Sequence, residues 1–330
     1  MDKPYLLFLG DARDDLAAKG SRGVLDWRPE DCLGQIRLDS CKADLGIADM
    51  TIAEAATGGA RTMIVGVANA GGFIPEDWVE TIVGALDAGM DVAAGMHSRL
   101  ADIEPIAEAA RRNGRQLFDV RHPTRDFAVG KGTKRSGKRL LAVGTDCSCG
   151  KMYTTLAIER EMKSQGRNAD FRATGQSGIF IAGDGIAVDA VVADFISGAI
   201  EWLTPDNDDD HWDIIEGQGS LFHASFAGVS LGLLHGAQPD ALVLCHEPTR
   251  SHMRGLPDRP LPGFAECMEA NISAARLTNP AVQFVGASVD TSRLSADARA
   301  PFLAAMESEI GLPCVDPMIT GVGRIVDNLA

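Results

Sequence analysis

The sequence predicts an α/β protein with two domains, each built on a parallel β-sheet. Three observations lead to this prediction. The chain has 330 residues, about twice the length of a typical domain. Short apolar runs alternate with segments of helical periodicity, an order typical of parallel sheets with right-handed crossovers. A G-x-x-x-x-G-K motif at residues 144–151 follows an apolar run and precedes a helical pattern, as phosphate-binding loops do.

The N-terminal part of the chain shows the alternation clearly. Pro75 suits the first turn of a helix, and Gly89 and Gly114 suit helix ends, because glycine readily adopts the left-handed conformation found there. We expect strands at residues 5–9, 61–67, 90–94 and 116–120, and helices at 75–88 and 103–113.

A second run of the same pattern follows. We expect strands at residues 139–143, 169–173, 213–215, 241–245 and 283–288, and helices at 151–165 and 188–200. Between the two runs lies the polar, glycine-rich and basic stretch 130–139, which suits a connection between domains. The sequence therefore predicts domains at residues 1–136 and 137–330.

Composition restricts the possible classes of protein. A net charge of −15 repels polyanions, which argues against binding to nucleic acid or acidic membranes. No apolar run reaches the roughly 18 residues that a membrane span needs, and the N-terminus resembles a first strand more than a signal peptide. Seven cysteines without framework spacing suggest reduced thiols. We expect a cytoplasmic homo-oligomer that binds small molecules.

The phosphate loop is the strongest local motif. Its glycines let successive backbone N–H groups surround phosphate oxygens, while the following helix N-terminus and Lys151 add positive charge. The residues that we expect to contact phosphates are Gly144, Thr145, Asp146, Cys147, Ser148, Cys149, Gly150, Lys151 and Met152.

Met152 departs from the pattern of phosphate-transferring enzymes. They carry Ser or Thr at this position, and its hydroxyl holds Mg²⁺. A thioether is a poor ligand for that cation, and Thr154 and Thr155 lie on other faces of the helix. This favours a diphosphate that is bound as a handle, as in coenzyme A. An ATP- and Mg²⁺-dependent ligase or kinase is the alternative, and a regulatory nucleotide-binding protein is a third possibility.

Polar residues follow several of the expected strands. In parallel sheets the segments that follow the carboxyl ends of the strands line the ligand crevice. Glu216, Gln218 and Ser220 are therefore expected to face the phosphate loop. Arg250 would pair with a substrate carboxylate in bidentate fashion. The full set of expected substrate-binding residues is Gln176, Ser177, Asp189, Gln218, Ser220, Glu247 and Arg250.

Two carboxylates are candidates for a general base. Glu216 ends a short apolar strand, and Asp194 lies in the apolar run 191–196, where burial would raise its pKa. We predict no metal site, because Cys147 and Cys149 alone lack a second ligand pair at suitable spacing. The stretch 130–139 between the two expected domains carries several basic residues, which would form a solvated linker or contact a phosphate of CoA. They are Lys131, Lys134, Arg135, Lys138 and Arg139.

Four long blocks of the sequence resemble the D-glutamate N-acetyltransferase family of the DgcN type, formerly catalogued as a domain of unknown function. They are GTDCSCGKMYTTLAIE, RATGQSGIFIAGDGIAVDAVVADFISGAIE, DIIEGQGSLFHASFAGVSLGLLHGAQPDALVLCHEPTR and VDPMITG. The resemblance implies a Rossmann-like N-terminal domain joined to a P-loop domain. The C-terminal half is also similar to dethiobiotin synthetase, whose phosphate loop and Glu-Gly-x-Gly strand exit match residues 144–151 and 216–219.

The resemblance also implies a reaction. The co-substrate would be acetyl-CoA and the acceptor a D-amino acid, chiefly D-glutamate. Glu216 or Asp194 would take the proton from the substrate ammonium. Gln218 or backbone N–H groups would stabilise the oxyanion, and Arg250 would fix the side-chain carboxylate of D-glutamate.

Overall fold

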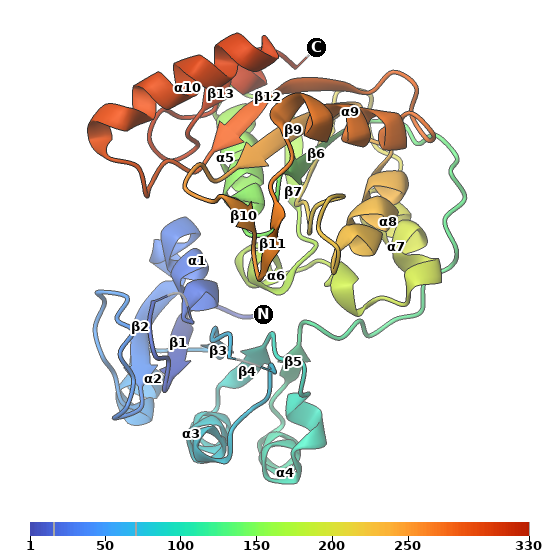
Figure 1. Ribbon diagram of the computed structural model, residues 1–330. Coiled ribbons are helices and arrows are strands. Elements are labelled where there is room, and N and C mark those ends of the chain that lie inside the picture. The colour runs from blue at the N-terminus through green and yellow to red at the C-terminus, as the bar shows by residue number, and fades with distance from the viewer. Residues whose placement is uncertain (16, 70, 330) are drawn as a thin grey trace. The chain divides into compact units, whose positions relative to one another are not determined.

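The computed structural model describes residues 1–15, 17–69 and 71–329 (Figure 1). The chain forms two compact units. The N-terminal unit comprises Met1–Thr124 and Gly175–Ala190, and the C-terminal unit comprises Arg125–Thr174 and Val191–Ala330. The boundary expected at residue 136 lies within the C-terminal unit. The chain passes from one unit to the other three times, so neither unit is a single continuous segment.

The N-terminal unit is built on a parallel five-stranded sheet with the order β2-β1-β3-β4-β5. Its strands are β1 (Tyr5–Gly10), β2 (Cys32–Arg37), β3 (Thr62–Val65), β4 (Asp91–Ala94) and β5 (Leu117–Asp119). Its helices are α1 (Lys19–Trp27), α2 (Ile52–Thr57), α3 (Glu76–Asp87), α4 (Glu104–Asn113) and α6 (Gln176–Ala182). The expected strands and helices of this region are confirmed, with ends shifted by one or two residues.

The core of this unit forms around β1, whose six residues are all buried. Trp78 of α3 packs edge-on against Phe8 of β1, with ring centroids 5.3 Å apart, and donates a hydrogen bond of 3.0 Å to Asp11. A Cβ on Gly10 would lie 2.7 Å from the Trp78 ring, so glycine is needed at this strand end. Helices α3 and α4 lie side by side (Figure 1).

The C-terminal unit is built on a parallel six-stranded sheet with the order β13-β12-β9-β6-β8-β7. Its strands are β6 (Lys138–Gly144), β7 (Ala169–Arg172), β8 (Trp212–Ile215), β9 (Ala241–His246), β12 (Gln283–Val289) and β13 (Cys314–Val315). A separate antiparallel hairpin consists of β10 (His252–Met253) and β11 (Leu256–Pro260). Strand β6 lies between β8 and β9, so its carboxyl end, where the phosphate loop begins, is central in the sheet.

The helices of this unit are α5 (Lys151–Ser164), α7 (Ile196–Leu203), α8 (Ala227–Ala237), α9 (Phe264–Ala275), α10 (Ala296–Ile310) and α11 (Gly323–Val326). Helix α5 packs on β6, β7 and β8, whereas α8 packs on β6 beside α7 and α9 (Figure 1). Among the described residues, no helix is long and apolar enough to cross a membrane.

The helix expected at residues 188–200 is wrong. The structure has two short 3₁₀ turns, Val188–Ala190 and Ala193–Phe195, before α7 begins at Ile196. The chain leaves the N-terminal unit after Ala190, and a continuous helix is incompatible with that crossing. No helix was expected at residues 176–182, but α6 forms there, with Ile179, Phe180 and Ile181 buried in it.

The basic stretch 130–139 is not a solvated linker throughout. Arg139 is fully buried and donates to the backbone carbonyls of Arg135 and Gly137 at 2.6 and 3.1 Å. Arg135 is buried too, and donates to the carbonyl of Gly236 at 2.8 Å. These two arginines are therefore buried and donate hydrogen bonds to backbone carbonyls.

Candidate functional site

The phosphate loop folds back over the end of β6. A Cβ on Gly144 would lie 2.6 Å from Sγ of Cys149 and 3.0 Å from Nζ of Lys151, so this position requires glycine. Gly150 caps α5 with a φ of +91°, a conformation that L side chains rarely adopt. The motif glycines therefore permit the tight turn that the sequence predicts.

Lys151 is the charged group of this loop. It is the first residue of α5 and is only 6% exposed. Its Nζ donates to the backbone carbonyl of Asp146 at 2.8 Å, so the ammonium lies inside the loop. The first turn of α5 contains no acidic residue, and the positive end of the helix dipole is not neutralised there. Both features suit a phosphate.

The two threonine hydroxyls near the start of α5 are engaged by the protein's own groups. Thr154 donates to the hydroxyl of Ser288 at 2.7 Å, and it also bonds the carbonyl of Gly150. Thr155 donates to the carbonyls of Lys151 and Met152. Both threonines therefore point away from the loop, as their positions along the helix predict.

Arg250 clamps the phosphate loop from the segment after β9. Its Nη1 donates to the Asp146 carboxylate at 2.8 Å and to the carbonyl of Cys147 at 2.6 Å, and its Nη2 donates to the carbonyl of Ser148 at 2.6 Å. Ser148 has a φ of +49°, which turns this carbonyl toward the guanidinium. Both terminal nitrogens of Arg250 bind the phosphate loop, whereas the sequence predicts that they bind a substrate carboxylate.

Asp146 and Glu247 complete the clamp. Burial by itself raises the pKa of both carboxyl groups, but hydrogen bonds and the Arg250 charge outweigh it, so both pKa values lie below the usual range. Asp146 accepts from the backbone N–H groups of Arg254 and Cys147, and Glu247 accepts from Thr249. Glu247 also lies 3.0 Å from Nε of Arg250. Both are therefore ionised around a single arginine.

His246 ends β9 beside the loop. Burial lowers its pKa to about 4, and the Arg250 charge acts in the same direction. The imidazole is consequently neutral at pH 7, and its Nδ1 lies 3.0 Å from the hydroxyl of Thr145. Its ring packs edge-on against Phe264 and stacks on Phe302.

Glu216 follows β8 and is 5% exposed. Its Oε2 accepts from the backbone N–H of Thr174 at 2.9 Å, and its backbone carbonyl accepts from the Thr174 hydroxyl at 2.6 Å. A Cβ on the next residue, Gly217, would lie 1.7 Å from the carbonyl of Ala142 in β6 and 2.9 Å from Cδ of Lys151. The β8 exit therefore passes directly against the strand that carries the phosphate loop.

Gln218 and Ser220 continue this exit. Gln218 donates to the hydroxyl of Thr174 at 3.2 Å, which places its amide in the same polar group as Glu216. Ser220 is buried, and its hydroxyl accepts from the backbone N–H of Phe222. Ser220 thus stabilises a turn.

Asp194 does not fit its expected role. The apolar run 191–196 predicts that Asp194 is buried, but Asp194 is exposed on a 3₁₀ turn. Val192 and Phe195, its apolar neighbours, are exposed as well. Without burial, the reason for choosing Asp194 as a base is absent, and Glu216 is the stronger of the two candidates.

Three of the expected substrate-binding residues lie in the N-terminal unit. Gln176 and Ser177 begin α6 and line a cavity of about 130 Å³, all of whose described lining residues belong to this unit. Asp189 does not line it but forms an ion pair with Arg121, which does. The sequence predicts these residues in the C-terminal domain, whereas they belong to the N-terminal unit.

One group of possible metal ligands occurs among the described residues. Asp146, Cys147 and His223 bring their ligand atoms within 4.8 Å of one another. Asp146 is already bound by Arg250 and by Arg254. Both nitrogens of His223 are engaged, with the backbone of Arg254 at 3.0 Å and of Ser225 at 3.2 Å. Asp146 and His223 therefore already bind the protein's own groups.

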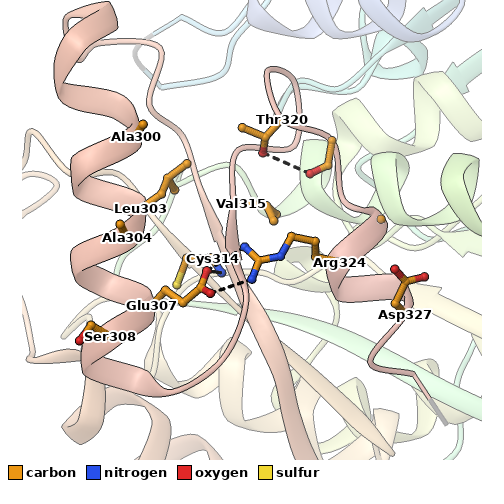
Figure 2. Close-up of a pocket in the computed structure, with 12 residues that line it drawn as sticks. Ala300, Leu303, Ala304, Glu307, Ser308, Cys314, Val315, Thr320, Arg324 and Asp327 are labelled. Atoms are coloured by element: carbon orange, nitrogen blue, oxygen red, sulfur yellow. Dashed lines mark hydrogen bonds and ion pairs between the residues drawn. The ribbon is translucent and has the colours of Figure 1, made fainter.

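A larger groove, of about 810 Å³, lies between α10, β13 and α11 (Figure 2). Arg324 donates to both carboxylate oxygens of Glu307 across it, at 2.7 and 2.8 Å. This pair satisfies both charges within the groove. None of the residues that line it belongs to the predicted site.

Comparison with known families agrees with this architecture. A family model described as the P-loop domain of DUF1611, a domain of unknown function, matches residues 126–326. A second, described as the Rossmann-like domain of the same family, matches residues 32–123. The chain belongs to the DUF1611 family. The expected fold class, a Rossmann-like domain followed by a P-loop domain, is confirmed.

This chain is similar to two curated proteins named D-glutamate N-acetyltransferase. That of Tritonibacter scottomollicae is 53% identical over 330 residues, covering 100% of this chain and 99% of the relative. That of a Pseudoalteromonas species is 51% identical, covering 99% and 98%. The crystal structure of a DUF1611 protein from Anabaena variabilis is 30% identical, with a TM-score of 0.88 and 99% of both chains covered. The family resemblance inferred from the sequence is confirmed.

Proposed function

We propose that this protein transfers the acetyl group of acetyl-CoA to the amino group of D-glutamate. The observation that supports this most is the identity of 53% and 51%, over essentially the whole chain, with two D-glutamate N-acetyltransferases. The similarity spans both domains, so it covers the phosphate loop and the N-terminal unit together.

The phosphate loop suits the diphosphate of CoA. Lys151, the loop N–H groups and the N-terminus of α5 would hold it, with the loop kept in shape by Arg250. Because Met152 replaces the Mg²⁺-binding hydroxyl, and Thr154 and Thr155 point elsewhere, the site favours binding the diphosphate over cleaving it. Acetyl-CoA supplies the activated thioester.

The transfer requires a neutral amine. The amine nitrogen forms the new bond to the acetyl carbon, the carbon–sulfur bond breaks, and a second proton from that nitrogen passes to the sulfur, so that CoA leaves as the thiol. The ammonium proton must go to a base, and we assign that role to Glu216. Its carboxylate is buried and is fixed in orientation by the Thr174 N–H. Gln218, bonded to the same threonine, is the nearby side-chain donor for the acetyl oxygen.

The cellular location and the oligomeric state are part of the same proposal. All seven cysteines are free, which agrees with a reducing cytoplasm. A homo-oligomeric state stays a prediction from the sequence.

The decisive assay mixes purified full-length protein with acetyl-CoA and D-glutamate. We expect release of CoA thiol and formation of N-acetyl-D-glutamate in equal amounts, detected by thiol titration and mass spectrometry. Lys151→Ala should raise the KM for acetyl-CoA at least tenfold, because it removes a charged phosphate contact. Lys163→Ala, at the solvent-exposed end of the same helix, is the matched control. ATP hydrolysis that requires Mg²⁺, without acetyl transfer, would support the ligase or kinase alternative instead.

A further inference from the structure

The N-terminal unit contains a small cavity at the carboxyl ends of its central strands. Its wall is formed by the start of α1, by the segments that follow β3 and β4, by Arg121 after β5, and by α6. Its volume is about 130 Å³, several times what a single water needs. This is enough for a small metabolite and too little for a dinucleotide.

The cavity lies where this topology favours ligand binding. In the order β2-β1-β3-β4-β5 the chain passes from β1 to β2 on one side and then to β3 on the other. Ligands of open parallel sheets bind beside such a change of direction, outside the carboxyl ends of the strands. Val65 ends β3 and Lys19 begins α1, the helix that follows β1, and both line the cavity.

The wall of the cavity is cationic. Its charged lining residues are Lys19 and Arg121, and none of the described lining residues is acidic. Asp189 pairs with Nη2 of Arg121 from outside the wall, which holds the guanidinium in place. A small anion would therefore be attracted to this cavity, in a protein whose overall charge is −15.

Polar groups of the wall add specificity. Gln176 and Ser177 supply an amide and a hydroxyl. A Cβ on Gly95 would lie 2.8 Å from Cβ of Gln176, so this glycine lets α6 approach the β4 exit. Asn69 also lines the cavity, and it donates to the carbonyl of Phe73 at 2.8 Å within the segment that follows β3.

We infer that this cavity binds the acceptor amino acid through its side-chain carboxylate, which lies toward Lys19 and Arg121, and leaves the amino group available for the reaction. The inference rests on the proposed acetyl transfer and adds the location of the acceptor. It assigns Gln176 and Ser177 the substrate-binding role expected from the sequence, and it makes Asp189 a positioning residue that acts through Arg121.

The test measures acceptor and co-substrate separately in the full-length protein. Lys19→Ala and Gln176→Ala should each raise the KM for D-glutamate about tenfold or more and leave the KM for acetyl-CoA within twofold. Lys42→Ala replaces an exposed lysine of the same unit outside the cavity, and it should change neither constant. Because Lys19 is exposed, its removal leaves the core packing intact, which thermal unfolding verifies.

A binding measurement separates this inference from the proposed function. Calorimetric titration should show D-glutamate binding to the wild type and at least tenfold weaker D-glutamate binding to Lys19→Ala. An active wild type with unchanged D-glutamate KM and affinity in both variants would overturn the cavity assignment alone. A wild type that binds D-glutamate in the cavity but transfers no acetyl group would contradict the proposed function instead.

Discussion

The guanidinium of Arg250 lies 2.8 Å from the carboxylate of Asp146, and this pair ties the phosphate loop to the segment that follows β9. Asp146 is almost completely buried, so its charge depends on that partner. The same guanidinium also binds two loop carbonyls. Arg250 is therefore better placed to shape the phosphate site than to bind a substrate carboxylate.

Arg250→Ala should weaken the binding of acetyl-CoA and destabilise the folded protein. The variant leaves Asp146 buried without its cation, at a cost of about 3 kcal/mol in the free energy of unfolding. We expect a KM for acetyl-CoA raised at least tenfold, measured by steady-state kinetics, and a lower midpoint of urea unfolding. Arg259→Ala, an exposed arginine of the nearby hairpin, is the control. A selective rise in the KM for D-glutamate would restore the substrate role predicted from the sequence.

Ser148→Gly should stabilise the protein slightly. Ser148 has a left-handed φ of +49°, which costs a residue with a Cβ about 1 kcal/mol. Glycine removes that cost but gains freedom in the unfolded chain, so the net increase in the free energy of unfolding is at most about 1 kcal/mol. Ser148→Val should have the opposite sign. Equal thermal midpoints for the two variants would contradict the strain at this position.

Glu216→Gln should lower kcat by roughly 10²- to 10⁴-fold, the usual contribution of a general base. The amide oxygen can still accept from the Thr174 N–H, so the KM for acetyl-CoA should change little. Asp194→Asn removes the exposed carboxylate that is the other candidate for the general base, and comparison of the two variants distinguishes the candidates. Loss of kcat in Asp194→Asn with an active Glu216→Gln would reverse the assignment.

His246 should make the protein less stable in mild acid. Its pKa is about 4 in the folded protein and about 6.5 in the unfolded chain. Between these values the unfolded chain binds a proton that the folded protein does not, so stability falls as pH falls from about 6.5 to 4. The full effect is about 3 kcal/mol. Denaturation of wild type and His246→Gln at pH 7 and pH 5 tests this: the variant should lose less stability between the two, and equal losses would exclude His246 as the cause.

Much of the fold could be predicted because it rests on local patterns. The apolar run of β1 and the helical periodicity of α3 appear in the sequence with nearly their final bounds. Helix α1 was missed because Gly20 and Gly23 lower its helix propensity. Tertiary packing explains Gly20: a Cβ there would lie 2.7 Å from the carbonyl of Gly66.

The sequence by itself determined the phosphate loop, its missing hydroxyl and the Glu216 strand exit, because spacing within a strand–loop–helix unit dictates which backbone and side-chain groups meet. Only the tertiary structure decided that Asp194 is exposed, that Arg250 serves the loop, and that α6 lines a cavity of the N-terminal unit. Each of these depends on packing between segments far apart in the chain. Periodicity reports the burial of a helix or strand face, but it carries no information on which distant charge or surface will lie against it.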